Sequence, residues 1–379
     1  MKTSARGGAT LAAIILVLLS TALPQLASAQ GESAVPFLLI APNSRASGIG
    51  ESGTGSVDDV SAIFWNPGEL AFKDGHQISI THANWLPQFQ LPDLFYDHLN
   101  YMQRVDAIGG TIGASITYLS LGEFNLTNSS GPEIIGTFKS YEYALTAGYA
   151  TKATDDLGVG INLRFIHSAL SPVGTESEQG NGIASTMSVD LAMMWRPVDL
   201  EVPVIGNIGK RFSLGVNLSN LGPKVTYVDA AQADPLPTNL RLGFGYRIFD
   251  DEFNSLEATL DFSRLLVRRR SDGTSDALPK SLITSWGDGG LRKVIGSGGL
   301  EYWYGSPKLI ALRIGYFNES VNFGNRKFLT FGAGIRYDIY GFDFSYISAG
   351  PDHPLSDTMR FSLMIGWGES DSAGASQGS

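Results

Sequence analysis

One short motif in the chain could bind a cofactor. Residues 48–53 read GIGESG and match the G-x-G-x-x-G pattern, whose glycines let a backbone approach the phosphates of a dinucleotide. The flanking sequence predicts no strand–helix–strand unit, and without that unit the pattern has little specificity. We therefore interpret these glycines as positions where the backbone bends, because glycine adopts conformations that other residues avoid.

The other residue types used in catalysis show no productive spacing. The chain contains no cysteine, which excludes disulfides, thiolate metal ligands and thiol nucleophiles. Its five histidines do not form the H-E-x-x-H pattern of a zinc site. No serine lies in a clear strand–turn–helix nucleophile elbow, so a lipase activity has little support. We expect neither an enzyme nor a bound cofactor or metal.

Charged side chains on the predicted strands could instead form ion pairs. A strand points successive side chains to opposite faces, and these charges lie opposite the apolar residues. Their mixed signs suggest a network of ion pairs across an enclosed lumen. Two interpretations stay open, namely that the charges line a water-filled channel or that they hold a plug. The candidate residues are Arg164, Asp190, Arg241, Arg247, Asp261, Arg313, Arg336, Asp343 and Arg360.

The elements that position these charges follow from apolar residues at every second position. Residues 212–219, 240–248 and 359–367 alternate almost perfectly, and about fourteen such segments follow residue 76. Most of these segments span roughly 10–13 residues. A strand in a soluble protein has about 5–6 residues, whereas a strand that crosses a membrane has about 9–11. The pattern predicts an all-β fold, a 14-stranded antiparallel transmembrane β-barrel with a small N-terminal helical hatch.

The connections and the tryptophans favour the same fold. Long connections are expected at residues 120–138, 169–184, 220–237 and 267–291, and they alternate with mostly tight turns. Residues 197–209 are an exception, since they are long where a short turn is expected. Trp195, Trp303 and Trp367 end alternate strands, and we expect them in an aromatic girdle at one membrane interface.

A helical signal precedes the first strand. In residues 56–72, SVDDVSAIFWNPGELAF, Asp58 or Asp59 can cap a short helix through Val60, Ile63 and Phe64. Pro67 disfavours helix at the residue before it and can begin a second turn. We expect a compact hatch within reach of the lumen, with Trp65 as a packing anchor rather than a ligand contact.

Four segments are expected along the chain. Residues 1–29 have a positive start, an apolar stretch and a small-residue cleavage site, which together predict a secretory signal peptide. The hatch is expected at residues 30–75, the transmembrane barrel at 76–368 and a disordered polar tail at 369–379. Export with barrel strands predicts the outer membrane. The formal net charge of −10 argues against a nucleic acid partner.

Several blocks in the same order resemble one family. PFLLIAPNSRASGIGESG, DDVSAIFWNPGELAF and GNRKFLTFGAGIRYDIYGFDFSYI are similar to the PorV family of the type IX secretion system, within the FadL-like group of barrels. The related PorQ group stays an alternative. The family's hatch motif corresponds to Trp65, Asn66 and Pro67, whereas Gly68 stands where alanine is common.

The resemblance implies a function without catalysis. PorV-like proteins are outer-membrane components that associate with a SprA-like translocon barrel, bind the C-terminal signal domains of exported cargo and pass the cargo to a surface complex with a PorU-like sortase. Outer-membrane lipid is the other expected partner. The alternative is a FadL-like channel for hydrophobic small molecules, which should have an apolar pocket near the hatch and a route out through the wall.

Overall fold

The structure is a computed structural model of the chain. It describes residues 33–127, 131–171, 182–229, 232–270, 272–350 and 353–368. The signal peptide expected at residues 1–29 and the polar tail expected at residues 369–379 lie outside the described residues.

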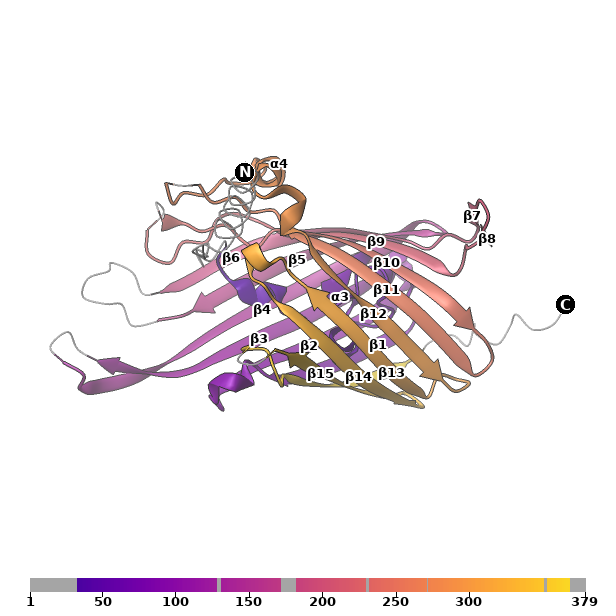
Figure 1. Ribbon diagram of the computed structural model, residues 1–379, viewed down its shortest axis with the longest axis horizontal. Coiled ribbons are helices and arrows are strands. Elements are labelled where there is room, and N and C mark those ends of the chain that lie inside the picture. Colours follow the sequence, from indigo (N-terminus) through magenta and orange to yellow (C-terminus); the bar gives the residue numbers. More distant parts are fainter. Residues whose placement is uncertain are drawn as a thin grey trace, which may run out of the picture. The chain divides into compact units, whose positions relative to one another are not determined.

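Fourteen antiparallel strands form a closed barrel (Figure 1). The first strand pairs with the last from His76↔Trp367 to Ala83↔Arg360, and this pairing closes the sheet. The predicted fold class is therefore confirmed. In chain order the barrel strands are β1 (His76–Asn84), β2 (Leu94–Val105), β3 (Gly110–Thr127), β4 (Ile134–Thr154), β5 (Leu157–Ala169), β6 (Ile183–Trp195), β9 (Phe212–Leu221), β10 (Asn239–Asp250), β11 (Asn254–Leu265), β12 (Ile295–Tyr304), β13 (Ile310–Asn318), β14 (Lys327–Tyr337), β15 (Tyr340–Ala349) and β16 (Met359–Trp367).

Two connections differ from a simple loop. Most of the connection expected at residues 120–138 is paired strand, because β3 and β4 extend their ladder as far as Thr127↔Ile134. Phe124 and Phe138 stack across this hairpin with ring centroids 5.7 Å apart, which stabilises the extension. The unexpectedly long connection after β6 contains a small hairpin of β7 (Glu201–Val202) and β8 (Gly206–Asn207).

Short helices make up the rest of the regular structure. Those before β1 are η1 (Pro36–Leu39), α2 (Ser44–Gly48), α3 (Ala62–Trp65) and η2 (Pro67–Phe72). The connections between strands carry η3 (Pro87–Phe89), η4 (Asp106–Ile108), α4 (Ser281–Thr284), η6 (Ser285–Gly287), η7 (Gly290–Lys293) and η8 (Val321–Phe323). None of the helices in the described ranges is long and apolar enough to cross a membrane.

The expected hatch helix is shorter than the sequence suggests. It forms only the single turn α3, and its Asp59 carboxylate accepts hydrogen bonds from the backbone and hydroxyl of Ser61 at its start. Asp58 is not a cap, because its carboxylate binds the guanidinium of Arg45. Pro67 does begin the second turn, η2, as expected. Neither proposed residue is therefore the cap: the N-cap of α3 is Ser61, which makes no side-chain capping hydrogen bond, and Asp59 lies 3.4 Å from Arg45 as well as binding Ser61.

The burial pattern of the barrel is the reverse of a soluble protein's. In β13 the exposed side chains include Leu312 and Ile314, whereas the alternating Arg313 and Phe317 are buried. Exposed apolar side chains recur in the same way on the other strands of the wall except β9, whose outward apolar side chains are half-buried, and polar side chains face the interior. An apolar outer face with a polar inner face is the arrangement that lipid requires, since lipid tails solvate apolar groups only.

One tryptophan departs from the expected girdle. Trp367 is exposed and stacks on His76, and half-buried Trp195 donates a hydrogen bond to Asp156 at the same end of the barrel. Trp303 is only 5% exposed and faces the lumen, so its assignment to the girdle was wrong. Its ring lies against the guanidinium groups of Arg313 and Arg336, and cation–π attraction is strong where water is excluded.

A charged side chain on the outer face at mid-membrane should destabilise the barrel. Ile314 is the central residue of β13, and Ile314→Arg should destabilise the barrel by about 2–4 kcal/mol because the guanidinium must enter hydrocarbon. Asn318→Arg, on the same face at the strand end, should cost about 0–1 kcal/mol. Urea unfolding in lipid vesicles, followed by tryptophan fluorescence, measures both. Equal costs would mean that this face does not contact lipid.

Candidate functional site

The segment before β1, here called the hatch (Ser33–Gly75), runs through the lumen from one end to the other. At the end of the barrel with the long connections, the Ala34 N–H donates to the Pro235 carbonyl at 3.0 Å. At the end with the short turns, the Lys73 carbonyl accepts from the Thr111 hydroxyl at the start of β3. The hatch thus contacts the wall near both ends of the barrel.

The motif residues Asn66 and Pro67 join the hatch to the wall. The Asn66 amide nitrogen donates to the carbonyls of Thr54 at 2.9 Å and Met193 at 3.0 Å, and therefore links two parts of the hatch to β6. Its amide oxygen accepts from the Gly68 N–H at 3.1 Å and caps η2, which Pro67 begins. Asparagine suits this position because one planar amide both donates and accepts.

Trp65 is a buried anchor, as expected. Its indole N–H donates to the Asn43 side chain at 2.9 Å, and its ring lies 4.8 Å from the guanidinium carbon of Arg241. A Cβ on Gly53 would come within 2.8 Å of the indole ring, and Gly50 has φ +81°. The GIGESG motif is thus explained by the path of the hatch: the glycines serve a bend and a close contact.

The largest charge cluster, here called the Arg45 cluster, crosses from the hatch to four strands, β12 to β15. The Arg45 guanidinium donates twice to the Glu301 carboxylate, at 2.7 and 2.6 Å, and Arg313 donates to the same carboxylate at 2.7 Å. Arg313 also reaches Asp343 at 2.8 Å, and Arg336 reaches Asp343 at 2.7 Å. These three guanidinium groups and two carboxylates alternate in sign, and Asp58 of the hatch, which also binds Arg45, balances the remaining positive charge.

A second cluster lies between β5 and β6. The Arg164 guanidinium binds the Asp190 carboxylate at 2.7 Å, and Asp190 also accepts from the Asn220 backbone N–H at 2.8 Å. Asn162 connects this cluster to the hatch, because its amide nitrogen donates to Asp190 at 3.0 Å and to the Ile63 carbonyl at 2.7 Å. The cluster therefore holds the hatch through hydrogen bonds as well as compensating its own charges.

The remaining predicted charges have separate roles. Asp261 accepts from the backbone N–H groups of Gly53 at 3.0 Å and Thr54 at 2.8 Å, so it binds the hatch directly. Arg360 lies 3.5 Å from Glu51 of the hatch. Arg247 is not part of a lumen network, because it pairs with half-exposed Asp250 at the short-turn end.

The expected network across the lumen is therefore corrected to several local clusters. The hatch occupies the space between opposite walls, so wall charges pair with neighbouring strands or with the hatch itself. Sequence reasoning missed Arg45, Glu51, Glu69 and Glu301. Strand alternation could have found Glu301, whereas the hatch residues have no periodicity that would reveal their direction. Glu69 is buried and pairs with Arg196 at 2.6 Å.

Glycines on the wall let the hatch backbone approach the strands. A Cβ on Gly215 of β9 would lie 1.8 Å from the Thr54 carbonyl oxygen. A Cβ on Gly315 of β13 would lie 2.0 Å from the Gly50 nitrogen. Any side chain at these positions must push the hatch away, because such distances are far shorter than a van der Waals contact. The wall is shaped to fit this plug.

A large cavity, here called the outer bowl, lies above the hatch at the end with the long connections. Its volume is about 1380 Å³, and hatch residues, the connection after β1 and the connections before β14 and β16 line it. Most of its side chains are apolar, including Phe37, Ile40, Trp85 and Leu121. At its edge, burial raises the pKa of Tyr227 to about 12, so its neutral hydroxyl donates to Ser168.

A side chain added at a wall glycine that contacts the hatch should displace the hatch. Gly315→Ala should open a path through the lumen, since the new methyl group collides with the Gly50 backbone. Single-channel conductance in planar bilayers should therefore rise above the wild-type level. Gly296→Ala on β12 is the control, because its Cβ would meet only the Phe262 ring at 3.9 Å. Unchanged conductance of the Gly315 variant would contradict a tightly fitted plug.

Breaking the Arg45 cluster should cost more than breaking an exposed pair. Glu301→Gln removes the carboxylate that compensates Arg45 and Arg313, and a broken buried pair costs about 3–5 kcal/mol. Asp250→Asn breaks the half-exposed pair with Arg247 and should cost about 0–1 kcal/mol. Urea unfolding in vesicles compares the two variants. A cost for Glu301→Gln no larger than that for Asp250→Asn would argue against the cluster as a main hatch contact.

Similar structures share the barrel. Two crystal structures of the Pseudomonas putida toluene transporter TodX align with TM-scores of 0.51 and 0.50 at 13% identity, covering 86% and 85% of this chain and 99% and 96% of those chains. The Ralstonia pickettii toluene transporter TbuX aligns at a TM-score of 0.48 and 14% identity over 86% of this chain and 98% of that chain. At these identities the TodX alignments show the fold alone. Comparison with curated protein sequences gives no match.

One family model identifies the chain. The model for the type IX secretion system protein PorV matches residues 27–272, which include the hatch and the strands from β1 to β11. The closed barrel with its apolar outer face is of the outer-membrane type. Because the match covers well over half of the sequence, this chain belongs to the PorV family of type IX secretion system proteins.

Proposed function

We propose that this protein serves type IX secretion by binding other proteins. In this proposal it associates with a SprA-like translocon barrel, binds the C-terminal signal domain of exported cargo and passes the cargo to the surface complex with a PorU-like sortase. The observation that carries the proposal is the fitted plug, because a barrel whose lumen is filled by its own chain is poorly suited to conduct solutes.

The energetics of the plug support this assignment. A solute that crossed the lumen would have to separate the hatch from the wall and break the pairs of Arg45 with Glu301 and of Glu69 with Arg196. Each broken buried pair costs about 3–5 kcal/mol unless water or the solute replaces the lost contacts. Glycines that accept the hatch backbone add close packing, which would also be lost.

The outer bowl is the best candidate for a protein contact. Its volume of about 1380 Å³ exceeds the about 300–1,000 Å³ of common small-molecule pockets. An apolar segment of a partner protein would fill it, and burial of apolar side chains would drive the association. Arg326, Lys327 and Glu142 add charges to the lining that can orient such a segment.

A second candidate is a channel for hydrophobic small molecules. The same bowl favours it, since the cavity is apolar and lies directly against hatch residues Phe37 and Ile40. A small apolar solute could enter the bowl from outside, and the hatch would have to move before the solute could leave. The two candidates therefore differ in what the bowl accepts and in whether transport requires a displaced hatch.

A charge inside the bowl tests the first candidate. Leu121→Asp introduces a carboxylate into the lining and should abolish surface display of cargo in a deletion strain, leaving cargo in the periplasm. Ile135→Asp is the control, because Ile135 is exposed on the β3–β4 hairpin and does not line the bowl. Protease treatment of intact cells reports surface cargo, and heat-dependent gel mobility reports barrel assembly.

Two outcomes would separate the candidates. Normal surface display in the deletion strain itself would remove the secretion proposal. Reduced uptake of a hydrophobic compound in the deletion strain, restored by the wild-type gene and not by Leu121→Asp, would support the channel instead.

A further inference from the structure

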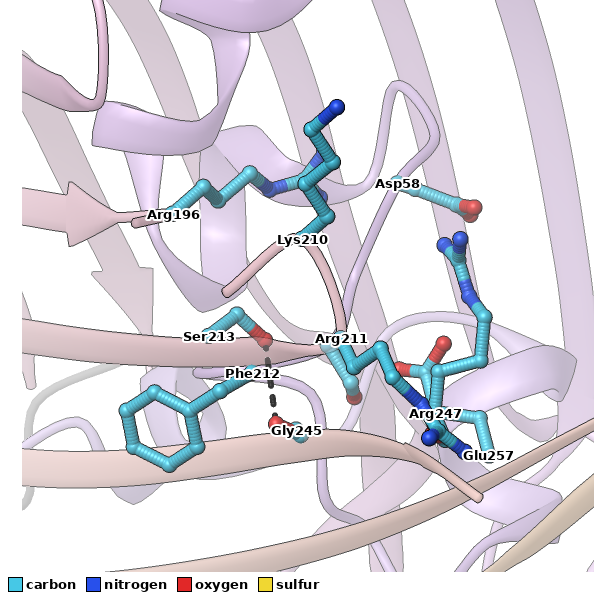
Figure 2. A pocket seen from close by; sticks show the side chains of 10 residues that line it. Asp58, Arg196, Lys210, Arg211, Phe212, Ser213, Gly245, Arg247 and Glu257 are labelled. Carbon is cyan, nitrogen blue, oxygen red and sulfur yellow. Dashed lines mark hydrogen bonds between the residues drawn. The ribbon is translucent and has the colours of Figure 1, made fainter. Parts of the chain in front are cut away.

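A second cavity lies at the short-turn end of the barrel, and Figure 2 shows the side chains that line it. Its volume is about 80 Å³, enough for several waters or a carboxylate group. Four cationic side chains converge on it from the end of β6, the start of β9 and the end of β10, and two carboxylates border it. The cations are Arg196, Lys210, Arg211 and Arg247, and the carboxylates are Asp58 and Glu257.

The positive charge of this cavity is only partly compensated. Arg211 donates to the carbonyls of Arg247 and Ile248, which are neutral partners. No ion pair is formed by Lys210 among the described residues, and its side chain is exposed. Arg196 pairs with Glu69 and Arg247 pairs with Asp250, so their charges are compensated, although the Nε atom of each has no hydrogen-bond partner in the described part of the chain. Lys210 and Arg211, which form no ion pair among the described residues, therefore supply the positive charge that favours an anionic ligand.

A hairpin with an apolar tip and two exposed carboxylates, Asp199 and Glu201, stands beside these cations. Arg196 and Arg211 are the two ends of the connection that contains β7 and β8, and the Lys210 N–H donates to the Pro197 carbonyl at 2.6 Å. The hairpin tip consists of Pro203, Val204 and Ile205, all of them exposed. Figure 1 shows this hairpin at the opposite end of the barrel from α4.

The tip residue Val204 is unfavourable for a free turn. Its φ of +77° lies in the left-handed region, which glycine and asparagine enter easily and a β-branched residue avoids. A fully exposed valine in that conformation is unfavourable both for the backbone and for the hydration of its apolar side chain. A partner that covers the tip would bury this side chain and offset that cost.

The cavity faces the periplasm rather than the bilayer. Hatch residues Ser56 and Asp58 form part of its lining, and the Ser213 hydroxyl donates to the Gly55 carbonyl at 2.5 Å from the lumen side of β9. A lipid headgroup would approach from outside the wall, whereas this cavity opens at the mouth of the lumen. A soluble ligand on the periplasmic side therefore fits better than a membrane lipid.

We propose that the cationic cavity and the β7–β8 hairpin together form a docking site for an acidic, partly apolar segment of a periplasmic protein. Carboxylates of that segment bind Lys210, Arg211 and the neighbouring arginines, and its apolar side chains cover Val204 and Ile205. The site lies at the opposite end of the barrel from the outer bowl, so it goes beyond the cargo function and can be tested separately.

A peptide titration tests the site on the full-length barrel in nanodiscs of zwitterionic lipid. The probe is a fluorescein-labelled peptide of alternating Glu and Val, with alternating Lys–Val and Gln–Val peptides for comparison. The Glu–Val peptide should bind best, and Lys210→Glu should weaken it at least about fivefold, because a cation becomes a like charge. The double variant Val204→Ser with Ile205→Ser should weaken it to a similar degree.

Arg104→Glu is the matched control, since it makes the same change of charge at the periplasmic end of β2, outside this cavity. Its affinity should stay within about twofold of wild type, because Arg104 does not line the cavity and salt screens charges that do not contact the peptide. Equal affinity of wild type and Lys210→Glu would overturn the proposal, as would equal binding of the Lys–Val peptide. Loss of phosphatidylglycerol enrichment in mixed-lipid nanodiscs on Lys210→Glu, with unchanged peptide affinity, would assign the surface to lipid and also overturn it.

Discussion

The constraint on which the whole molecule depends is that lipid offers no hydrogen bond to a polypeptide backbone. Each unpaired N–H or C=O group in hydrocarbon costs several kcal/mol, so a membrane-spanning sheet must leave no edge. The pairing of β1 with β16 meets this requirement and joins the first and last strands of the barrel. Closure in turn forces half of all strand side chains into an enclosed lumen. The polar side chains among them then need partners that replace the water they lose.

The hatch supplies many of these partners. Buried charges are tolerable only when partners replace the water that they lose, and here the partners come from neighbouring strands and from the hatch. Arg45 exemplifies this arrangement, because one hatch guanidinium compensates Glu301, which also binds Arg313 on the next strand. Small wall residues such as Gly215 complete the fit by admitting the hatch backbone. Polar pairing and close packing therefore act together to make the plug part of the barrel.

A filled lumen leaves two chemically different ends. The outer bowl is wide and apolar, whereas the periplasmic cavity is small and cationic. The hatch separates them and contributes residues to both, such as Phe37 to the bowl and Asp58 to the cavity. Such a barrel is organised to present two surfaces to different partners, and the same segment of chain connects both surfaces physically.

The sequence by itself determined the strands, their number and the family. Alternation with a period of two can be recognised along one strand without knowing which strands pair with it. It also located the Asn66–Pro67 break and most of the charged lumen positions. Only the tertiary structure decided which charges meet. Arg164 and Asp190 pair on adjacent strands, Arg247 leaves the lumen network, and Trp303 turns inward onto arginines. Those outcomes depend on register and on the path of the aperiodic hatch, and both arise from contacts between residues far apart in the chain.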